Sequence, residues 1–323
     1  MISILEIKNF KSIKHITLDC RKVNIFIGKP NTGKSNILES VSIFSILYDK
    51  LEAFIRFENI ANLFYDQDTE RKIEVIADDS FCTLEFEQGK FIGKGNYQLK
   101  EKSIHIQFEY GFEGWKGGSV DTSLSLPIKF YRFFSLDKFP KQELNFLLPP
   151  KGENLLALLL ANKELRKLVS DLFAEFGIRI GLKPLENKIE ILKETDGIII
   201  SYPYSLVSDT LRRVAFYLVA LETNKDSIIL FEEPEAHSFP FYTKYLAERI
   251  ALDETNQFFI STHNPYFLLS LLEKTRQNEL GIFITYFEDY QTRVKQLSAN
   301  EVSEFFDLDA SVFFNLDRFL GEE

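Results

Sequence analysis

The chain has 323 residues, of which 45% are hydrophobic and 14% are aromatic, so it can bury one large core or two modest ones. This composition excludes a disordered protein. Asp and Glu number 48 against 38 Lys and Arg. The resulting net charge of -10 excludes a wholly basic nucleic-acid surface, although it leaves room for a local basic patch.

The sequence shows no segment typical of export or of membrane insertion. The first residues, MISILEIKNF, alternate in hydrophobicity and carry charge early, unlike a signal peptide. The longest apolar run, NLLALLLAN, is much shorter than the roughly 20 residues that span a bilayer. Cys20 and Cys82 lie far apart and form no metal-binding spacing, so they are expected to be reduced, buried thiols. We therefore expect a cytoplasmic protein without membrane contact.

The chain begins with segments typical of strands. ISILEIKNF and HITLD alternate with a period of two residues, and KVNIFIG is a short apolar run that enters Gly28. Apolar residues at helical spacing follow from Ile37 to Leu51, so the sequence predicts an amphipathic helix there.

The segment GKPNTGKS, which joins that strand to that helix, fits the phosphate-loop pattern G-x-x-x-x-G-K-[ST] in full. Its glycines let successive backbone N–H groups point at phosphate oxygens, Lys34 supplies a cation, and the Ser35 hydroxyl can ligate Mg²⁺. A chance match is the alternative, but the flanking strand and helix oppose it. We therefore predict a site for ATP and Mg²⁺ whose loop consists of Gly28, Lys29, Pro30, Asn31, Thr32, Gly33, Lys34 and Ser35.

Residues 71–136 look β-rich, because KIEVIA, CTLEFE, SIHIQFEY and PIKFYRFF are separated by turn-like segments. Residues 140–178 have a helical pattern, and NKIEILKETDGIIISYP predicts a hairpin with Asp-Gly at its turn. From DTLRRVAFYLVALETN onward, helices and strands alternate, which predicts an α/β fold with a largely parallel core sheet.

Two carboxylates follow the apolar strand SIILF. A strand that ends in an acid beside a phosphate loop usually holds Mg²⁺, which suggests this role for Glu232. The next acid, Glu233, can orient and deprotonate the attacking water. The alternative is an ordinary strand that ends in solvated acids, and the phosphate loop upstream favours the functional interpretation.

His263 ends a second strand, QFFIST, where it can hold the attacking water or sense the γ-phosphate. A capping or packing histidine is the alternative. His15 and His105 lie in strand patterns without a partner, so we expect them to be structural or surface residues. For His237 the sequence does not decide between a functional role and a structural one.

Together these motifs resemble an ABC-type ATPase head of the SMC/RecF/OLD branch, closest to OLD-like AAA family ATPases that lack the nuclease domain. IKNFKSIKHITLD followed by VNIFIGKPNTGKSNILES looks like the opening of that branch, including Asn36 after GKS. FEEPEAHSFP is similar to the acidic pair and turn of OLD-type ATPases, and ISTHNPYFL resembles their histidine switch. The resemblance covers most of the chain, although residues 60–125 carry no specific motif.

The resemblance implies a P-loop NTPase fold with a two-lobed head, an antiparallel β region and an inserted helical lobe. Residues 1–136 and 224–323 would form the nucleotide-binding lobe, and residues 137–223 would form the helical signature lobe. Two heads would dimerise around two ATP molecules. The resemblance also assigns roles to site residues: general base for Glu233, Mg²⁺ ligand for Ser35 and Glu232, switch for His263, and nucleotide contacts for Lys11, Ser12 and Asn36.

The segment YSLVSDTLRR stands where this branch carries the signature loop, so Ser208 and Asp209 would contact the partner's nucleotide. Both residues also suit an ordinary helix N-cap. Relatives of the OLD type often carry a glycine where this chain has Thr210. Two further departures are Glu232 in place of the usual Asp and Phe239 in place of a second His, and Lys151 occupies the neighbourhood of the usual Gln. The missing glycine, Glu232 and Phe239 favour slow or partner-dependent hydrolysis, whereas Lys151 puts the contact of the usual Gln in doubt.

Three functions compete at this stage. The first is a dimeric ATPase that acts on DNA or in phage defence with a separate nuclease or effector, because too few residues follow His263 for an appended nuclease domain. The second is an ATP-gated clamp that hardly hydrolyses. The third is the energising subunit of a transporter, which the GKSN and EEPEAH segments oppose.

Overall fold

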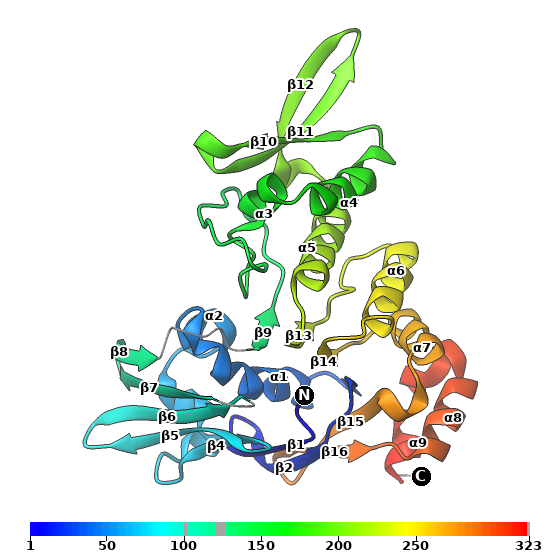
Figure 1. Cartoon of the computed structure of the whole chain (residues 1–323). Helices are drawn as coiled ribbons and strands as arrows, with labels where there is room; N and C mark the ends of the chain where they lie inside the picture. Colours follow the sequence, from blue (N-terminus) through cyan, green and yellow to red (C-terminus); the bar gives the residue numbers. More distant parts are fainter. Residues whose placement is uncertain (100–101, 121–126, 322–323) are drawn as a thin grey trace. The chain divides into compact units, whose positions relative to one another are not determined.

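The computed structural model describes residues 1–99, 102–120 and 127–321, and these form two compact units (Figure 1). The first unit contains Met1–Phe130, Asp226–Glu233 and Thr255–Glu323, and the second contains Tyr131–Lys225 and Pro234–Glu254. The functional lobes expected from the resemblance, with a boundary near residue 137, remain a prediction.

The first unit is built on a six-stranded sheet. Its strand order is β16 (Gln291–Gln296), β15 (Leu280–Glu288), β3 (Val23–Gly28), β14 (Gln257–Ser261), β13 (Ile228–Glu232) and β9 (Ile128–Tyr131). Strands β15, β3, β14 and β13 are parallel, whereas β16 pairs antiparallel with β15. The sequence-based prediction of an α/β fold with a largely parallel core sheet is confirmed.

Burial explains why these strands read as continuous apolar runs. Every residue of β3 is buried, and so are the first four residues of β13 and all of β14. A parallel strand that is covered on both faces must be apolar throughout, whereas a half-exposed strand alternates. The carboxyl ends of β3, β13 and β14 therefore bring the phosphate loop, Glu232 and Ser261 to one edge of the sheet.

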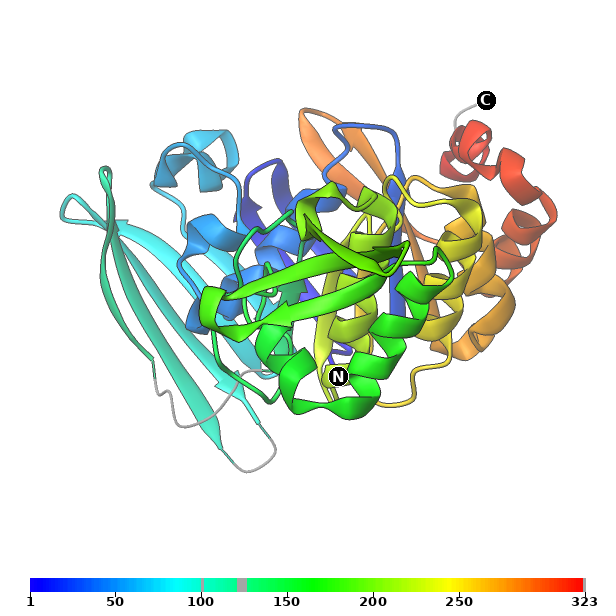
Figure 2. The ribbon, with the colours of Figure 1, turned by 90° about the horizontal axis from the view of Figure 1, so that it is seen from above.

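A seven-stranded antiparallel sheet forms the rest of the first unit's β structure. Its order is β2 (Ile13–Asp19), β1 (Ile4–Phe10), β4 (Ile73–Ala77), β5 (Ser80–Glu87), β6 (Lys90–Gln98), β7 (Ser103–Gly111) and β8 (Gly114–Val120). Figure 2 shows the cyan and teal strands of this sheet side by side. The segment PIKFYRFF, expected with this β-rich region, instead supplies β9 to the core sheet.

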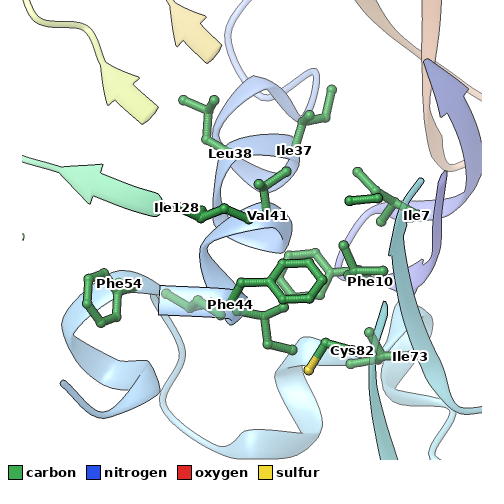
Figure 3. Packing of buried hydrophobic residues seen from close by; sticks show 14 of the residues in the cluster. Ile7, Phe10, Ile37, Leu38, Val41, Phe44, Phe54, Ile73, Cys82 and Ile128 are labelled. Atoms are coloured by element: carbon green, nitrogen blue, oxygen red, sulfur yellow. The ribbon is translucent and has the colours of Figure 1, made fainter. Parts of the chain in front are cut away.

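An apolar core lies between this antiparallel sheet and the helical segment after the phosphate loop. Helix α1 (Lys34–Val41) contributes Ile37, Leu38 and Val41, and the sheet contributes side chains such as Ile73 and Cys82 (Figure 3). Burial raises the pKa of the Cys82 thiol to about 12, so this cysteine is an inert core residue.

Two expected long helices are broken in the structure. Helix α1 ends at Val41 and gives way to a 3-10 segment, Ser42–Leu47, and then to the short helix α2 (Leu51–Phe54). The Ser40 and Ser42 hydroxyls bond to backbone carbonyls three residues back, which competes with regular helix geometry.

The second break lies in the second unit, between α3 (Leu155–Ala161) and α4 (Lys163–Ala174). The side chain of Asn162 accepts hydrogen bonds from Glu164 N and Leu165 N, so it caps a new helix instead of continuing the old one.

The second unit combines these helices with α5 (Asp209–Thr223), α6 (Pro240–Ala251) and a small antiparallel sheet. The sheet has the order β10 (Arg179–Lys183), β11 (Lys188–Thr195) and β12 (Ile198–Pro203). Asp196 and Gly197 join β11 to β12 with positive φ angles of 53° and 74°, as a hairpin turn of the primed type requires. The predicted Asp-Gly hairpin is confirmed.

The C-terminal part returns to the first unit with α7 (Pro265–Lys274), α8 (Ala299–Asp307) and α9 (Leu316–Leu320). Among the described residues, none of the helices combines the length and the apolar character that a membrane span needs.

Candidate nucleotide site

The phosphate loop connects β3 to α1, and its two glycines are required by close contacts. Gly28 has a φ of 153°, and a Cβ atom there would lie 2.3 Å from the carbonyl oxygen of Thr285. Gly33 has a φ of 96°, and its Cβ would lie 2.1 Å from Thr292 Oγ1. Only glycine fits either position, so the loop keeps the narrow, side-chain-free backbone that phosphate oxygens can approach.

Lys34, the invariant cation of the phosphate-loop pattern, is folded over that loop. Its Nζ donates to the carbonyl oxygens of Gly28 and Lys29 at 2.8 Å each, and the side chain is buried. Burial lowers the pKa of Lys34 to about 8, while the charge of Glu233 opposes that shift. A bound triphosphate would satisfy this buried cation better than two neutral carbonyls, so the donor set fits ATP.

Hydroxyl groups of the β15–β16 hairpin brace the loop. Thr32 Oγ1 lies 2.6 Å from Thr285 Oγ1 and donates to Lys29 O at 2.8 Å. Thr292 Oγ1 lies 2.7 Å from Ser12 Oγ. Sequence reasoning did not find Thr285 and Thr292, because their contact with the loop depends on strand register.

The predicted residues Ser12 and Asn36 belong to the same bracing. Asn36 Nδ2 donates to Ser12 Oγ at 2.7 Å, and Thr292 N donates to Ser12 O at 2.7 Å. Pro30 and Asn31 are exposed at the tip of the loop. Lys29 Nζ makes an exposed ion pair with Asp317 at 2.8 Å.

The two predicted carboxylates lie at the end of β13. Glu233 adopts a positive φ of 43°, and its N–H donates to Ser261 O on the neighbouring strand. Its Oε1 lies 3.2 Å from His263 Nε2. The hydrogen bond with His263 holds the pKa of Glu233 below its usual value, and the charges of Lys34 and Arg56 act in the same direction. Glu233 is therefore an ionised carboxylate with a histidine neighbour, which suits a base that holds water.

Arg56 is a site residue that the sequence analysis missed. It donates through Nη2 to Glu232 Oε1 at 3.0 Å and through Nε to Glu39 Oε1 at 2.7 Å. Glu39 is fully buried and also accepts a hydrogen bond from Lys11 Nζ. The predicted nucleotide contact Lys11 is thus tied to Glu39. No motif surrounds Arg56, so only the fold reveals its place.

The oxygen donors near the loop fit Mg²⁺. Mg²⁺ usually takes one or two protein oxygens together with nucleotide phosphates and water. Ser35, in the first turn of α1, and Glu232, at the end of β13, supply hydroxyl and carboxylate oxygens. Within the described residues, no group of three or more His, Cys, Asp or Glu side chains forms a self-sufficient metal cage.

The predicted signature residues lie in the second unit, at the start of α5. Ser208 is the N-cap, and its side chain accepts from Leu211 N at 3.4 Å. Asp209 pairs with Arg212 and Arg213. The helix-cap interpretation is confirmed for Ser208, whereas Asp209 is the first residue of α5, and the proposed contact with a partner's nucleotide remains a prediction.

Thr210, which stands where relatives often carry glycine, joins this helix start to the turn before α6. Its Oγ1 donates to His237 O at 2.8 Å, and His237 has a positive φ of 58°. Phe239 occupies the N-cap position of α6, where its ring is exposed and makes no capping hydrogen bond. Lys151 Nζ lies 5.0 Å from the Phe134 ring centroid.

Comparison with known families is consistent with this geometry. Residues 1–176 match the family described as AAA ATPase domain. Residues 130–270 match a second family, described as AAA domain, putative AbiEii toxin, type IV TA system. The first match extends over more than half of the chain.

Two curated proteins are similar to part of the chain. An ATP/GTP phosphatase from Helicobacter pylori is 31% identical over 118 residues, which is 32% of each protein. An uncharacterized protein from Methanocaldococcus jannaschii is 26% identical over 132 residues, which is 36% of this chain and 58% of the relative. The match thus spans about a third of the length of the Helicobacter pylori protein and somewhat more than half of the Methanocaldococcus jannaschii protein.

The fold also matches a solved structure over nearly its whole length. An SMC head, crystallised with the C-winged helix domain of ScpA, aligns with a TM-score of 0.54 at 17% identity, covering 94% of this chain and 99% of that one. At this identity the likeness concerns the fold alone, which is that of an SMC head.

Proposed function

Because the chain belongs to the AAA ATPase domain family, we propose that it binds ATP with Mg²⁺ and hydrolyses it as a head of the OLD-like group. The observation that carries the proposal is the contact between Glu233 and His263 at the strand ends that adjoin the phosphate loop. Glu233 is ionised, Lys34 acts on it electrostatically, and a water held by this pair would face the γ-phosphate.

Each site residue has a defined part in this proposal. The backbone of residues 28–35 and Lys34 would bind the phosphates. Ser35 and Glu232 would hold Mg²⁺, which would neutralise phosphate charge when bound. Glu233 accepts a proton from water as the water oxygen bonds to the γ-phosphorus and the bond to the β-phosphate oxygen breaks. His263 orients that water.

We further propose that ATP joins two heads, with Ser208 and Asp209 of one head at the nucleotide of the other. The capped start of α5 supports this role, because free N–H groups at a helix N-terminus attract anions. The proposal includes work in phage defence or on DNA in the cytoplasm, with a separate nuclease or effector as partner. The family description supports only an association with a putative toxin of a type IV TA system.

A clamp that binds ATP but hardly hydrolyses it is the second candidate. Arg56 already occupies one oxygen of Glu232, and an arginine there competes with Mg²⁺ for the carboxylate. Slow turnover would follow if this ion pair persists when ATP is bound.

The deciding experiment compares ATP turnover in wild type and Glu233→Gln. Glu70→Gln is the matched control, because Glu70 is an exposed carboxylate in a turn outside the site. We expect Glu233→Gln to keep ATP binding and to lose about 100-fold in turnover, the range of a general base. Equal turnover in all three proteins would refute the role of Glu233. If wild-type turnover is negligible while ATP still binds, the clamp is the correct function.

Dimerisation has its own test, light scattering of Glu233→Gln with and without ATP. We expect a monomer without nucleotide and a dimer with it, since the variant binds ATP but cannot hydrolyse it. A monomer under both conditions across a wide concentration range would contradict the paired heads.

A further inference from the structure

The outer face of the antiparallel sheet carries a groove that the ATPase chemistry does not use. It has a volume of about 640 Å³ and is lined by Phe81, Lys94, Gly95, Asn96, His105, Ile106, Gln107 and Ser119. These residues come from β5, β6, β7 and β8, strands that lie side by side in Figure 2. All of them belong to the first unit.

Strand register places the groove's side chains in two rows. Phe81 pairs with Asn96, and Asn96 pairs with His105, so these three form one row across β5, β6 and β7. Lys94 and Gln107 form the next row, which continues to Ser119. Residues directly opposite each other on neighbouring strands have Cβ atoms about 5 Å apart, so each row is a continuous line of side chains.

The centre of the groove holds an unsatisfied polar atom. Asn96 Oδ1 is buried, yet it has no hydrogen-bond partner among the described residues. Buried polar atoms are nearly always paired, and leaving one unpaired costs roughly 1–3 kcal/mol, so such an atom calls for an explanation. A ligand that displaces the side chains covering this oxygen and bonds to the amide supplies one.

The neighbours of Asn96 restrict the shape of that ligand. Phe81 on one side is 42% exposed, and His105 on the other side is exposed as well. Two strand spacings separate these rings, which is about 9.5 Å. The gap above Asn96 is therefore wide enough for one planar ring, which can lie against one of the two side chains with its edge toward the amide.

The next row adds a charge preference. Lys94 is an exposed cation on the same face, and none of the described side chains forms an ion pair with it. Gln107 beside it is a further hydrogen-bonding group. A ligand that lies over both rows therefore joins a planar ring to an anion.

From this placement we propose that the groove binds a nucleotide unit, with the base on Asn96 between Phe81 and His105 and the phosphate at Lys94. A base edge presents adjacent donors and acceptors, which an amide can match in a bidentate pair. Aromatic side chains that stack on bases beside a cation for the backbone are also the elements of single-strand recognition. The unit is either a free mononucleotide or one residue of a single-stranded nucleic acid.

The test uses the full chain with Lys34→Ala, so that the phosphate loop does not capture the nucleotide. Binding of AMP, ribose 5-phosphate and maltose is measured by calorimetry, and binding of a labelled single-stranded oligonucleotide by fluorescence anisotropy. We expect AMP to bind at least about tenfold more tightly than ribose 5-phosphate, because stacking and the amide pair require the base. Tighter binding of the oligonucleotide than of AMP identifies nucleic acid as the source of the unit, and the reverse identifies the free nucleotide.

Three further substitutions locate the site. Asn96→Ala weakens AMP binding about tenfold and leaves the unfolding midpoint unchanged or higher, because it removes an unsatisfied polar atom. Lys94→Ala weakens AMP binding and, if the oligonucleotide binds, lowers its salt slope by about 0.7. Lys90→Ala is the matched control on the same strand and face, where Lys90 pairs with Glu109 outside the groove, and it leaves binding unchanged.

Several outcomes overturn the proposal. Absence of AMP and oligonucleotide binding at concentrations up to roughly 10 mM would refute it. So would equal binding of maltose and AMP, which would mark a sugar site, or equal losses in Lys94→Ala and Lys90→Ala, which would mark a general effect of charge. Because every protein in these measurements carries Lys34→Ala, none of the outcomes depends on ATP hydrolysis.

Discussion

Arg56 links Glu232, at the end of β13, to Glu39, which is fully buried in α1. One guanidinium group thus bonds to two carboxylates that are far apart in the sequence, with N–O distances of 2.7 Å to Glu39 and 3.0 Å to Glu232. A planar guanidinium with several donors suits such a double contact, which an ammonium group would not reproduce. Glu232, the candidate Mg²⁺ ligand, therefore already has one carboxylate oxygen paired with Arg56 before any metal binds.

Replacing Arg56 with Met removes both contacts, and the loss of each one should have a different measurable effect. The free energy of unfolding should fall by about 1–3 kcal/mol, because buried Glu39 loses a charged hydrogen-bond donor and keeps Lys11. The Mg²⁺ concentration needed for half-maximal ATP turnover should also fall, because a cation that competes for Glu232 is gone. Chemical denaturation and a Mg²⁺ titration measure the two effects.

Arg71→Met is the control for that substitution, since the Arg71 side chain makes only an exposed ion pair with Asp68 among the described residues. It should leave both quantities unchanged. An unchanged or increased Mg²⁺ requirement in Arg56→Met would contradict competition between arginine and metal.

The hydroxyl of Thr292 should matter for nucleotide affinity although it lies outside the loop. Thr292→Val keeps the shape of the side chain and removes the hydrogen bond to Ser12 Oγ. Loss of one such brace corresponds to about 1 kcal/mol, so ATP affinity should fall roughly fivefold. Thr195→Val, on the exposed end of β11, is the control and should bind ATP normally. Identical affinities in both variants would show that the hairpin does not organise the loop.

These residues show where sequence reasoning succeeds and where it stops. The phosphate loop is local, so a strand, eight residues and a helix were enough to recognise it. Glu233 and His263 were recognised separately, as polar residues at the ends of two apolar strands, and their contact at 3.2 Å is a finding of the structure. Arg56 and Thr292 carry no such signal, because their contacts arise from the course of the chain after α1 and from the register of β15 and β16.

Helix limits were harder to predict than helix positions. Apolar spacing extended the first helix to Leu51, yet serine hydroxyls that bond back to the backbone end its regular part at Val41. Asn162 divided the second in the same way, because a side chain that caps the following helix outweighs continued apolar spacing. Such side-chain contacts compete with periodicity and become visible only in the structure.

The stability of the free protein should depend on pH through Lys34. Its pKa is lowered from 10.5 to about 8 by burial, so between these values the unfolded chain holds a proton that the folded protein has released. The free energy of unfolding therefore rises with pH through that window, by on the order of 3 kcal/mol if the window is crossed fully.

The measurement is the unfolding free energy of wild type minus that of Lys34→Met, from pH 7 to about 10, without nucleotide. The difference should increase with pH, because only wild type carries the titrating group at this position. Subtraction also removes other titrations, such as that of Lys129, whose pKa burial likewise lowers to about 8. A difference that stays flat or decreases would refute the buried, proton-releasing state of Lys34.

The side chain of Thr210 tests the signature interpretation of α5 against a purely structural one. Thr210→Gly restores the residue that OLD-type relatives often carry and lets backbone approach a phosphate, so turnover should rise severalfold if Ser208 and Asp209 contact a partner's nucleotide. It also removes the hydrogen bond to His237 O and costs about 1 kcal/mol of helix stability. Thr210→Ser keeps the hydroxyl and should behave like wild type. If turnover falls in Thr210→Gly and is normal in Thr210→Ser, the hydroxyl that fixes the turn at His237 is the essential feature, and a phosphate contact at this helix start is contradicted.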